Sequence, residues 1–170
     1  DQIWNPIYTF GSPIYFLSFA EAHKRVAYAA SFGVTEIDDN VSQEFRELLR
    51  GMFRISVREA QGAKIVNKLT GQDVPVLVDP TLLLSREQWL SISRKHPVGP
   101  FSKYLLTYFL DGLPKKYQKQ IDAIAIANNL EIVNLADIKS PEMYKVGPLE
   151  FLDLINRSSL FCTNSFHGVV

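Results

Sequence analysis

Short apolar runs and longer stretches with helical periodicity alternate along the 170 residues of the chain. Six runs predict strands, over residues 24–30, 54–57, 74–79, 103–110, 131–135 and 160–163. The stretches between them predict helices that begin near Ser42, cover 59–70, follow Ser85, cover 114–129 and begin at Pro148. Because strands and helices alternate, the pattern predicts right-handed βαβ units, and hence parallel sheets with helices on both faces.

Local signals define the ends of several of these helices. Ser42 is the expected N-cap of a helix whose apolar positions repeat at the i, i+3, i+4 and i+7 spacing. Gly71 is expected to end the next helix at the C′ position. Ser85, with Gln88 three residues later, is the signature of a capping box and predicts another helix start.

Residues 96–102 contain the strongest linker signal, with two prolines and a glycine within the first five positions. We therefore predict two Rossmann-like parallel-sheet halves, residues 1–95 and 103–170, each of them incomplete. The chain begins without Met and ends where the pattern predicts the start of an element, so we expect it to be an internal piece of a longer protein. Apolar surface is accordingly expected to lie open near Trp4 and residues 169–170.

Composition narrows the possible functions. Hydrophobic residues make up 46%, which is enough for a core and argues against a disordered chain. Lys and Arg together number 18, as do Asp and Glu, so a protein that neutralises many phosphates of a nucleic acid is not expected. One cysteine, Cys162, excludes an internal disulfide and suits a reducing compartment, and with three histidines it makes a zinc site hard to assemble. No apolar stretch approaches the roughly 20 residues that span a bilayer.

Polar residues with possible chemistry lie where predicted strands end, the edge at which parallel α/β sheets bind ligands. Arg58 follows the strand over 54–57, and its planar guanidinium suits a carboxylate or a phosphate. A simple pair with Glu59 on the exposed helix start is the alternative. Asp79 could hydrogen-bond a sugar hydroxyl or orient a cation, or it could only close an Asp-Pro turn.

Two further clusters contain candidates. Asp1 and Gln2 lie beside Trp4, a grouping that equally fits a turn around a half-buried tryptophan. Residues 163–168 lead from a strand into a helix start, where unpaired N–H groups favour an anion. His167 would lie in the first turn of that helix, where it could bind or protonate a bound group. The alternative is a buried histidine with no such role. The G-x-S-x-G, G-x-G-x-x-G and P-loop motifs are absent.

Taken together and in this order, the clusters resemble the polysaccharide pyruvyl transferase family. Members of that family carry a Gly-Ser-Asp-Gln-Ile-Trp-Asn segment, a basic strand of small residues, and Ser-Val-Arg-Glu, Asp-Pro-Thr and Thr-Asn-Ser-Phe-His-Gly motifs. The matching segments here are residues 1–5, 24–33, 56–59, 79–81 and 163–168, so the resemblance covers essentially the whole chain. It implies a two-domain fold similar to GT-B glycosyltransferases, with the active site in the cleft between the domains.

The resemblance also implies a reaction. Phosphoenolpyruvate would give its pyruvyl group to hydroxyls of a cell-surface polysaccharide or its lipid-linked precursor, forming a ketal and releasing phosphate. Arg58 and His167 match the family's donor-binding arginine and histidine and are the expected catalytic residues. The expected substrate-binding residues are Asp1, Gln2, Asp79, Asn164 and Ser165. Neither a metal nor a cofactor beyond the donor substrate is expected, and the protein is expected in the cytoplasm or at the inner face of the membrane.

Two alternatives remain open at this level. A GT-B-like glycosyltransferase would bind a nucleotide sugar in place of phosphoenolpyruvate, but a Glu after a Gly-rich turn in the second half is not seen. A non-catalytic glycan-assembly protein would keep the fold without the reaction, although intact Arg58 and His167 count against it. The Gly-Ser expected before Asp1 and the first strands of the fold lie outside these residues, so this chain is expected to be inactive alone.

Overall fold

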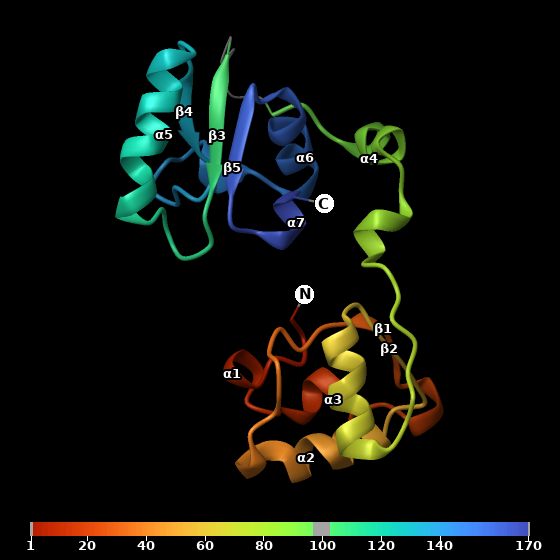
Figure 1. Cartoon of the computed structure of the whole chain (residues 1–170). Helices are drawn as coiled ribbons and strands as arrows, with labels where there is room; N and C mark the ends of the chain where they lie inside the picture. Colours follow the sequence, from red (N-terminus) through yellow and green to blue (C-terminus); the bar gives the residue numbers. More distant parts are fainter. Residues whose placement is uncertain (1, 97–102, 170) are drawn as a thin grey trace. The chain divides into compact units, whose positions relative to one another are not determined.

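The structure, a computed structural model, describes residues 2–96 and 103–169. Within these residues the strands form two separate sheets, β1-β2 and β4-β3-β5 (Figure 1). Neighbouring strands within each sheet are parallel. This confirms the predicted mixed α/β class with parallel sheets. The chain divides into two compact units, residues 1–83 and 84–170, which are described separately below.

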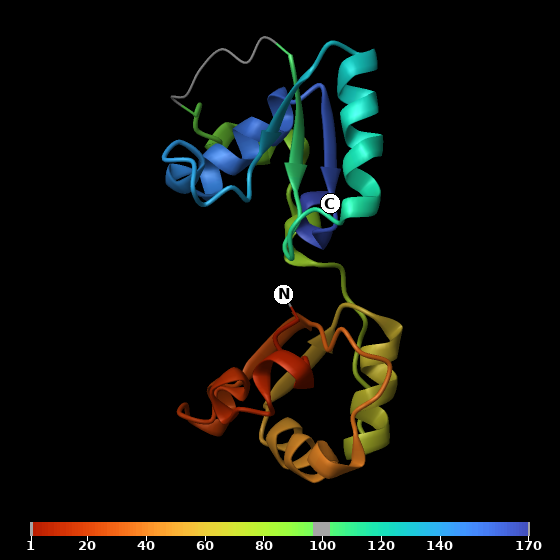
Figure 2. The same ribbon diagram turned by 90° about the vertical axis from the view of Figure 1, so that its left-hand side faces the viewer.

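The first unit is built around the parallel pair β1-β2. Val26 of β1 lies opposite Arg54 of β2, and the register shifts between Ala27 and Ala30. Helices α2 and α3 pack against each other beside this sheet (Figure 2). The elements of the unit are α1 (Pro6–Thr9), η1 (Pro13–Phe16), η2 (Ala22–Lys24), β1 (Val26–Ala30), α2 (Asp39–Arg50), β2 (Arg54–Val57), α3 (Ala60–Thr70) and η3 (Pro80–Leu83).

An aromatic cluster around Trp4 forms part of the core of this unit. Trp4 is only 1% exposed, and its ring stacks on Phe16 with centroids 5.3 Å apart. The indole N–H donates a hydrogen bond to the carbonyl of Tyr15 at 3.1 Å. The Trp4 ring itself is therefore buried, but the neighbouring side chains of Ile7, Tyr8 and Phe10 are exposed, which confirms the predicted open apolar surface near Trp4. Val169 is exposed as expected, whereas Val170 lies outside the described residues.

Two local predictions in this unit are wrong. Residues 74–79 form no regular strand: Val76 makes one isolated parallel bridge with Val57, and its side chain is about half exposed. Pro75 has no N–H to donate to a ladder, which limits the pairing. Helix α2 begins at Asp39 rather than after Ser42, because Asp38 is the last extended residue before it. The predicted end of α3 is confirmed, since Gly71 takes a left-handed conformation with φ of 77°.

The second unit is a sandwich of helices around a three-stranded sheet. Strand β3 is central, with β4 on one side and β5 on the other. Leu105 of β3 packs with Ile121 of α5, while Leu106 packs with Leu154 of α6, so the predicted helices on both faces are confirmed here (Figures 1 and 2). The elements are α4 (Arg86–Ile92), β3 (Tyr104–Tyr108), α5 (Lys115–Ala127), β4 (Glu131–Asn134), η4 (Met143–Lys145), α6 (Pro148–Arg157), β5 (Leu160–Thr163) and α7 (Phe166–Val169).

Residues 84–96 belong to the second unit, although the sequence assigned residues up to 95 to the first. The capping box predicted for Ser85 is present at the start of α4. Helix α4 packs on α6, where Arg86 Nη2 donates to Asn156 Oδ1 at 2.6 Å. The backbone N–H of His96 donates to Asp153 Oδ2 at 2.9 Å. Of the predicted linker 96–102, only His96 lies within the described residues, and it is buried.

Candidate functional site

Arg58 stands directly after β2 and is held between two carboxylates. Its Nη1 donates to Asp79 Oδ2 at 2.9 Å, and these two side chains are only 12% and 7% exposed. Its Nε lies 3.7 Å from Glu59 Oε2, so the simple Arg–Glu pair that the sequence offered as an alternative is also formed. The guanidinium is thus fixed at the carboxyl end of the sheet, where parallel α/β folds bind ligands.

Asp79 does more than pair with Arg58. Its second oxygen, Oδ1, accepts hydrogen bonds from the backbone N–H of Thr81 at 3.0 Å and from the Thr81 hydroxyl at 2.8 Å. This is the side-chain-to-backbone bond of an Asp-Pro turn, which was the second reading of Asp79 from the sequence. Asp79 therefore closes its own turn with one oxygen and binds Arg58 with the other.

Glu59 is a member of this network that the sequence did not single out as a site residue. Its Oε1 accepts hydrogen bonds from the hydroxyl of Ser31 at 3.1 Å and from the backbone N–H of Phe32 at 3.0 Å. The carboxylate thereby joins the residues after β1 to the start of α3. Its place next to Arg58 in the Ser-Val-Arg-Glu motif was the available signal, but its partners lie 27 and 28 residues earlier in the chain.

Gln2 lies beside the same end of β1. Its Oε1 accepts a hydrogen bond from Asn5 Nδ2 at 2.8 Å, and the backbone N–H of Trp4 donates to the carbonyl of Ser31 at 3.1 Å. The Gln2 side chain packs so closely on Gly33 that a Cβ there would lie 2.4 Å from it, and Gly33 has a φ of +64°. Asp1 lies outside the described residues.

The candidates of the second unit gather after β3 and β5. Thr163 Oγ1 donates to the carbonyl of Tyr108 at 2.7 Å and accepts from the backbone N–H of Ser165 at 2.9 Å. Asn164 Oδ1 accepts from the backbone N–H of Leu110 at 3.0 Å, which ties the turn after β5 to the turn after β3. His167 is partly exposed in the short α7, with its ring edge-on to the ring of Phe166 at 5.1 Å.

The structure thus brings together two sets of predicted residues. Arg58 and Asp79 meet in the first unit, with Gln2 at the end of the adjacent strand. Asn164, Ser165 and His167 gather in the second. A shared donor site containing Arg58 and His167 stays a prediction. Among the described residues, no group of three or more His, Cys, Asp or Glu side chains could hold a metal ion.

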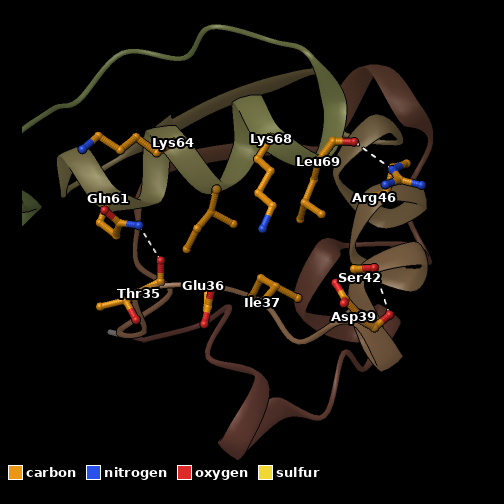
Figure 3. A pocket seen from close by; sticks show the side chains of 11 residues that line it. Thr35, Glu36, Ile37, Asp39, Ser42, Arg46, Gln61, Lys64, Lys68 and Leu69 are labelled. Carbon is orange, nitrogen blue, oxygen red and sulfur yellow. Dashed lines mark hydrogen bonds between the residues drawn. The ribbon is translucent and has the colours of Figure 1, made fainter.

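A cavity that no motif pointed to lies in the first unit between α2, α3 and residues 35–39 (Figure 3). Its volume is about 220 Å³, and the ammonium group of Lys68 points into it from α3. Arg46 Nε closes one end by donating to the carbonyl of Leu69 at 2.9 Å, and the amide of Gln61 donates to the carbonyl of Thr35 at the other. Its charged lining has both signs, so it selects no ligand by charge alone.

Comparison with known proteins places these residues in a family. The family model for polysaccharide pyruvyl transferase matches the chain over residues 2–170. The chain belongs to this family. The match covers the Arg58 network and the cluster around His167 alike, and it confirms the resemblance derived from the motifs. No curated protein and no solved structure matches the chain.

Membership in the polysaccharide pyruvyl transferase family implies transfer of a pyruvyl group, with a polysaccharide as the acceptor. Arg58 and His167 stay the candidate site residues at the described strand ends. As to membrane insertion, none of the helices in the described part of the chain has the length and apolar character of a bilayer span.

Proposed function

We propose that this protein takes the pyruvyl group from phosphoenolpyruvate and links it as a ketal to two hydroxyls of a cell-surface polysaccharide or its lipid-linked precursor. The observation that carries the proposal is the family match over residues 2–170. The fixed guanidinium of Arg58 at the carboxyl end of β2 supports it, because the donor is an anion. We further propose that the domains of the protein have a GT-B-like arrangement. The proposed location is the cytoplasm, which includes a peripheral position at the inner face of the membrane.

The reaction needs one acid and several anion contacts. A proton adds to the methylene carbon of phosphoenolpyruvate, and one acceptor hydroxyl forms a bond to the adjacent carbon while losing its own proton. The second hydroxyl then displaces phosphate from that carbon, which closes the ketal ring. A cation beside the carboxylate and phosphate stabilises the charge that develops on the leaving group, and a positioned acid supplies the first proton.

Arg58 and His167 suit these two roles in different ways. Arg58 is the proposed donor-binding cation, and its pairing with Asp79 holds it ready before the donor arrives. Asp79 and Glu59 together carry one negative charge more than Arg58 balances, so the net charge of this group alone does not attract an anion. A second cationic group is therefore needed, and we propose protonated His167, which would also serve as the acid.

Kinetics with phosphoenolpyruvate and a glycan acceptor test these roles through the release of phosphate. Arg58→Ala should remove a charged contact and raise the KM for phosphoenolpyruvate by about 10- to 150-fold. His167→Ala should lower kcat by about 10²- to 10⁴-fold. Arg54→Ala and His23→Ala are matched controls, because both side chains are exposed and belong to neither cluster. Thermal unfolding of each variant separates a lost contact from a lost fold.

Three outcomes would contradict the proposal. Wild-type kinetics in both Arg58→Ala and His167→Ala would remove these residues from the site. Turnover of a nucleotide sugar, with none of phosphoenolpyruvate, would make the protein a glycosyltransferase. Binding of a glycan without turnover of either donor would favour a non-catalytic glycan-assembly protein.

A further inference from the structure

We propose that Asp79 and Thr81 are positioning residues that hold the guanidinium of Arg58, and that Asp79 is not a ligand of the substrate. The inference rests on the proposed function, since it concerns the donor site of the same reaction. It changes the role that the sequence suggested for Asp79. It also adds Thr81, which no motif argument had given a role of its own.

The first support is the way the Asp79 carboxylate is held. Thr81 binds Oδ1 through both its backbone N–H and its hydroxyl, at 3.0 and 2.8 Å. Two hydrogen bonds from one residue prevent the carboxylate from rotating, so Oδ2 stays directed at Arg58 Nη1, 2.9 Å away. The Asp79 side chain is only 7% exposed, which leaves a substrate hydroxyl little access to either oxygen.

The second support is the backbone that brings the two residues together. Val57, the residue before Arg58, donates to the carbonyl of Pro75 at 3.1 Å and accepts from the N–H of Leu77 at 2.8 Å. Arg58 itself donates its backbone N–H to the carbonyl of Ala30 at 3.2 Å. The extended segment before Asp79 therefore runs beside β2, and its end meets the end of that strand. This explains why residues 74–79 lie along β2 although they form no regular strand.

The third support is electrostatic. Phosphoenolpyruvate carries a carboxylate and a phosphate, and an ionised Asp in direct contact with either group would repel it. Asp79 paired with Arg58 avoids this contact, because the guanidinium rather than the carboxylate meets the donor. An arginine side chain loses much rotational freedom when it binds, and a partner that orders it beforehand reduces that loss at the moment of binding. Asp79 thus aids donor binding only through Arg58.

A double-mutant cycle distinguishes positioning from direct contact. The variants are Arg58→Ala, Asp79→Ala and the two combined, and the measurements are kcat and the KM for phosphoenolpyruvate. Asp79→Ala alone should raise this KM by about 10-fold or more, since a charged hydrogen bond is lost. In the Arg58→Ala background it should have no further effect, because there is no guanidinium left to orient. Effects that multiply would show that Asp79 contacts a substrate itself and would overturn the proposal.

Thr81 provides a milder test that leaves all charges in place. Thr81→Val removes the hydroxyl that donates to the ionised Asp79 carboxylate, and it should raise the KM for phosphoenolpyruvate by about 10-fold with little change in kcat. Thr81→Ser keeps the hydroxyl and should restore the wild-type KM. Thr70→Val is the matched control, because its hydroxyl donates to the carbonyl of Val66 at 2.8 Å and accepts from the backbone N–H of Gln72 at 3.2 Å, and neither partner belongs to the Arg58 network.

The outcomes separate this inference from the proposed function. If Arg58→Ala leaves the kinetics unchanged, the donor site itself is wrongly assigned. If Arg58→Ala raises the KM but Thr81→Val does not, the donor site stands and the role of Thr81 is overturned. A change in Thr81→Val that Thr81→Ser does not reverse would also overturn it, because the effect would then come from packing rather than from the hydroxyl.

Discussion

Single residues in this protein take their roles from partners that are distant in sequence. Arg58 would be an exposed cation at a helix start if only its neighbours were considered. Asp79, 21 residues later, makes it an oriented group with a side chain only 12% exposed. Trp4 likewise packs with Phe16 and Phe32, which are distant from it in sequence. For single residues, burial therefore decides whether a polar or aromatic side chain is available to bind a ligand or packs within the fold.

Trp4 is a residue for which the structure predicts a large effect on stability. Trp4→Ala should lower the free energy of unfolding by about 3–5 kcal/mol, because it leaves a cavity beside Phe16 and removes the bond to Tyr15. Trp4→Phe should have a smaller effect, since it keeps a ring in the stack. Phe19→Ala is the control, because Phe19 is 74% exposed and should change stability by less than about 0.5 kcal/mol. Equal losses in urea unfolding for Trp4→Ala and Phe19→Ala would contradict the packing described here.

Elements are held together here by polar bridges as well as by apolar faces. Asp153 of α6 accepts hydrogen bonds from Arg157, at 2.9 and 2.5 Å, and from the backbone N–H of His96. Burial acts to raise the pKa of Asp153, but the hydrogen bonds from Arg157 and His96 outweigh it and hold the pKa below its ordinary value. The residues after α4 are thereby fastened to α6 by an ionised carboxylate.

This bridge predicts an acid-sensitive contribution to stability. A carboxyl whose folded pKa lies below its unfolded pKa stabilises the fold above about pH 4, and that contribution is lost as the pH falls through the folded pKa. Asp153→Asn should therefore lower stability at neutral pH and weaken its dependence on pH below about 4. Urea unfolding between pH 2.5 and pH 7 measures both effects, with Asp111→Asn, in an exposed turn, as the control. An unchanged pH profile in Asp153→Asn would contradict the role given to the bridge.

The end of α3 gives a second prediction at the scale of an element. Gly71 has a φ of +77°, and no atom lies within 4 Å of where its Cβ would be. Gly71→Ala should therefore destabilise the protein by about 1 kcal/mol through backbone strain alone, without a steric clash. Gly71→Asn should cost less, because Asn tolerates the left-handed region better than Ala. Thermal unfolding of the two variants tests the order, and an Asn variant less stable than the Ala variant would contradict it.

At the scale of the whole molecule, the core is divided between the two units. One cluster of buried residues, which includes Leu49 and Val57, lies in the first unit. Two further clusters lie in the second, on opposite faces of the β4-β3-β5 sheet. None of these three described clusters contains residues of both units, so a cavity in one leaves the packing of the other intact.

This division predicts that core substitutions act locally. Leu106→Ala, at a fully buried position of β3, should destabilise the second unit by about 2–5 kcal/mol. Amide hydrogen exchange should then quicken across β3, β4 and β5 but stay unchanged in α2 and α3. Leu49→Ala in α2 should give the reverse pattern. Faster exchange throughout the chain in either variant would show that the two units unfold as one.

The sequence by itself determined those features that depend on near neighbours. The alternation of strands and helices, the cap at Ser85 and the end of α3 at Gly71 follow from periodicity and from local backbone preferences. The order of the motifs was also enough to recognise the polysaccharide pyruvyl transferase family. Periodicity and capping signals lie within a few neighbouring residues, and the family signal lies in the order of motifs along the chain. Both kinds of signal can therefore be recognised without the fold.

Only the tertiary structure decided which residues meet. It buried Trp4, assigned α4 to the second unit, and left residues 74–79 with one bridge to β2 instead of a full strand. It also paired Asp79 with Arg58 and made Glu59 the link to Ser31. These outcomes depend on contacts between residues about 10 to 70 positions apart, and on which groups lose water when those contacts form. Neither quantity is present in the local pattern of the chain.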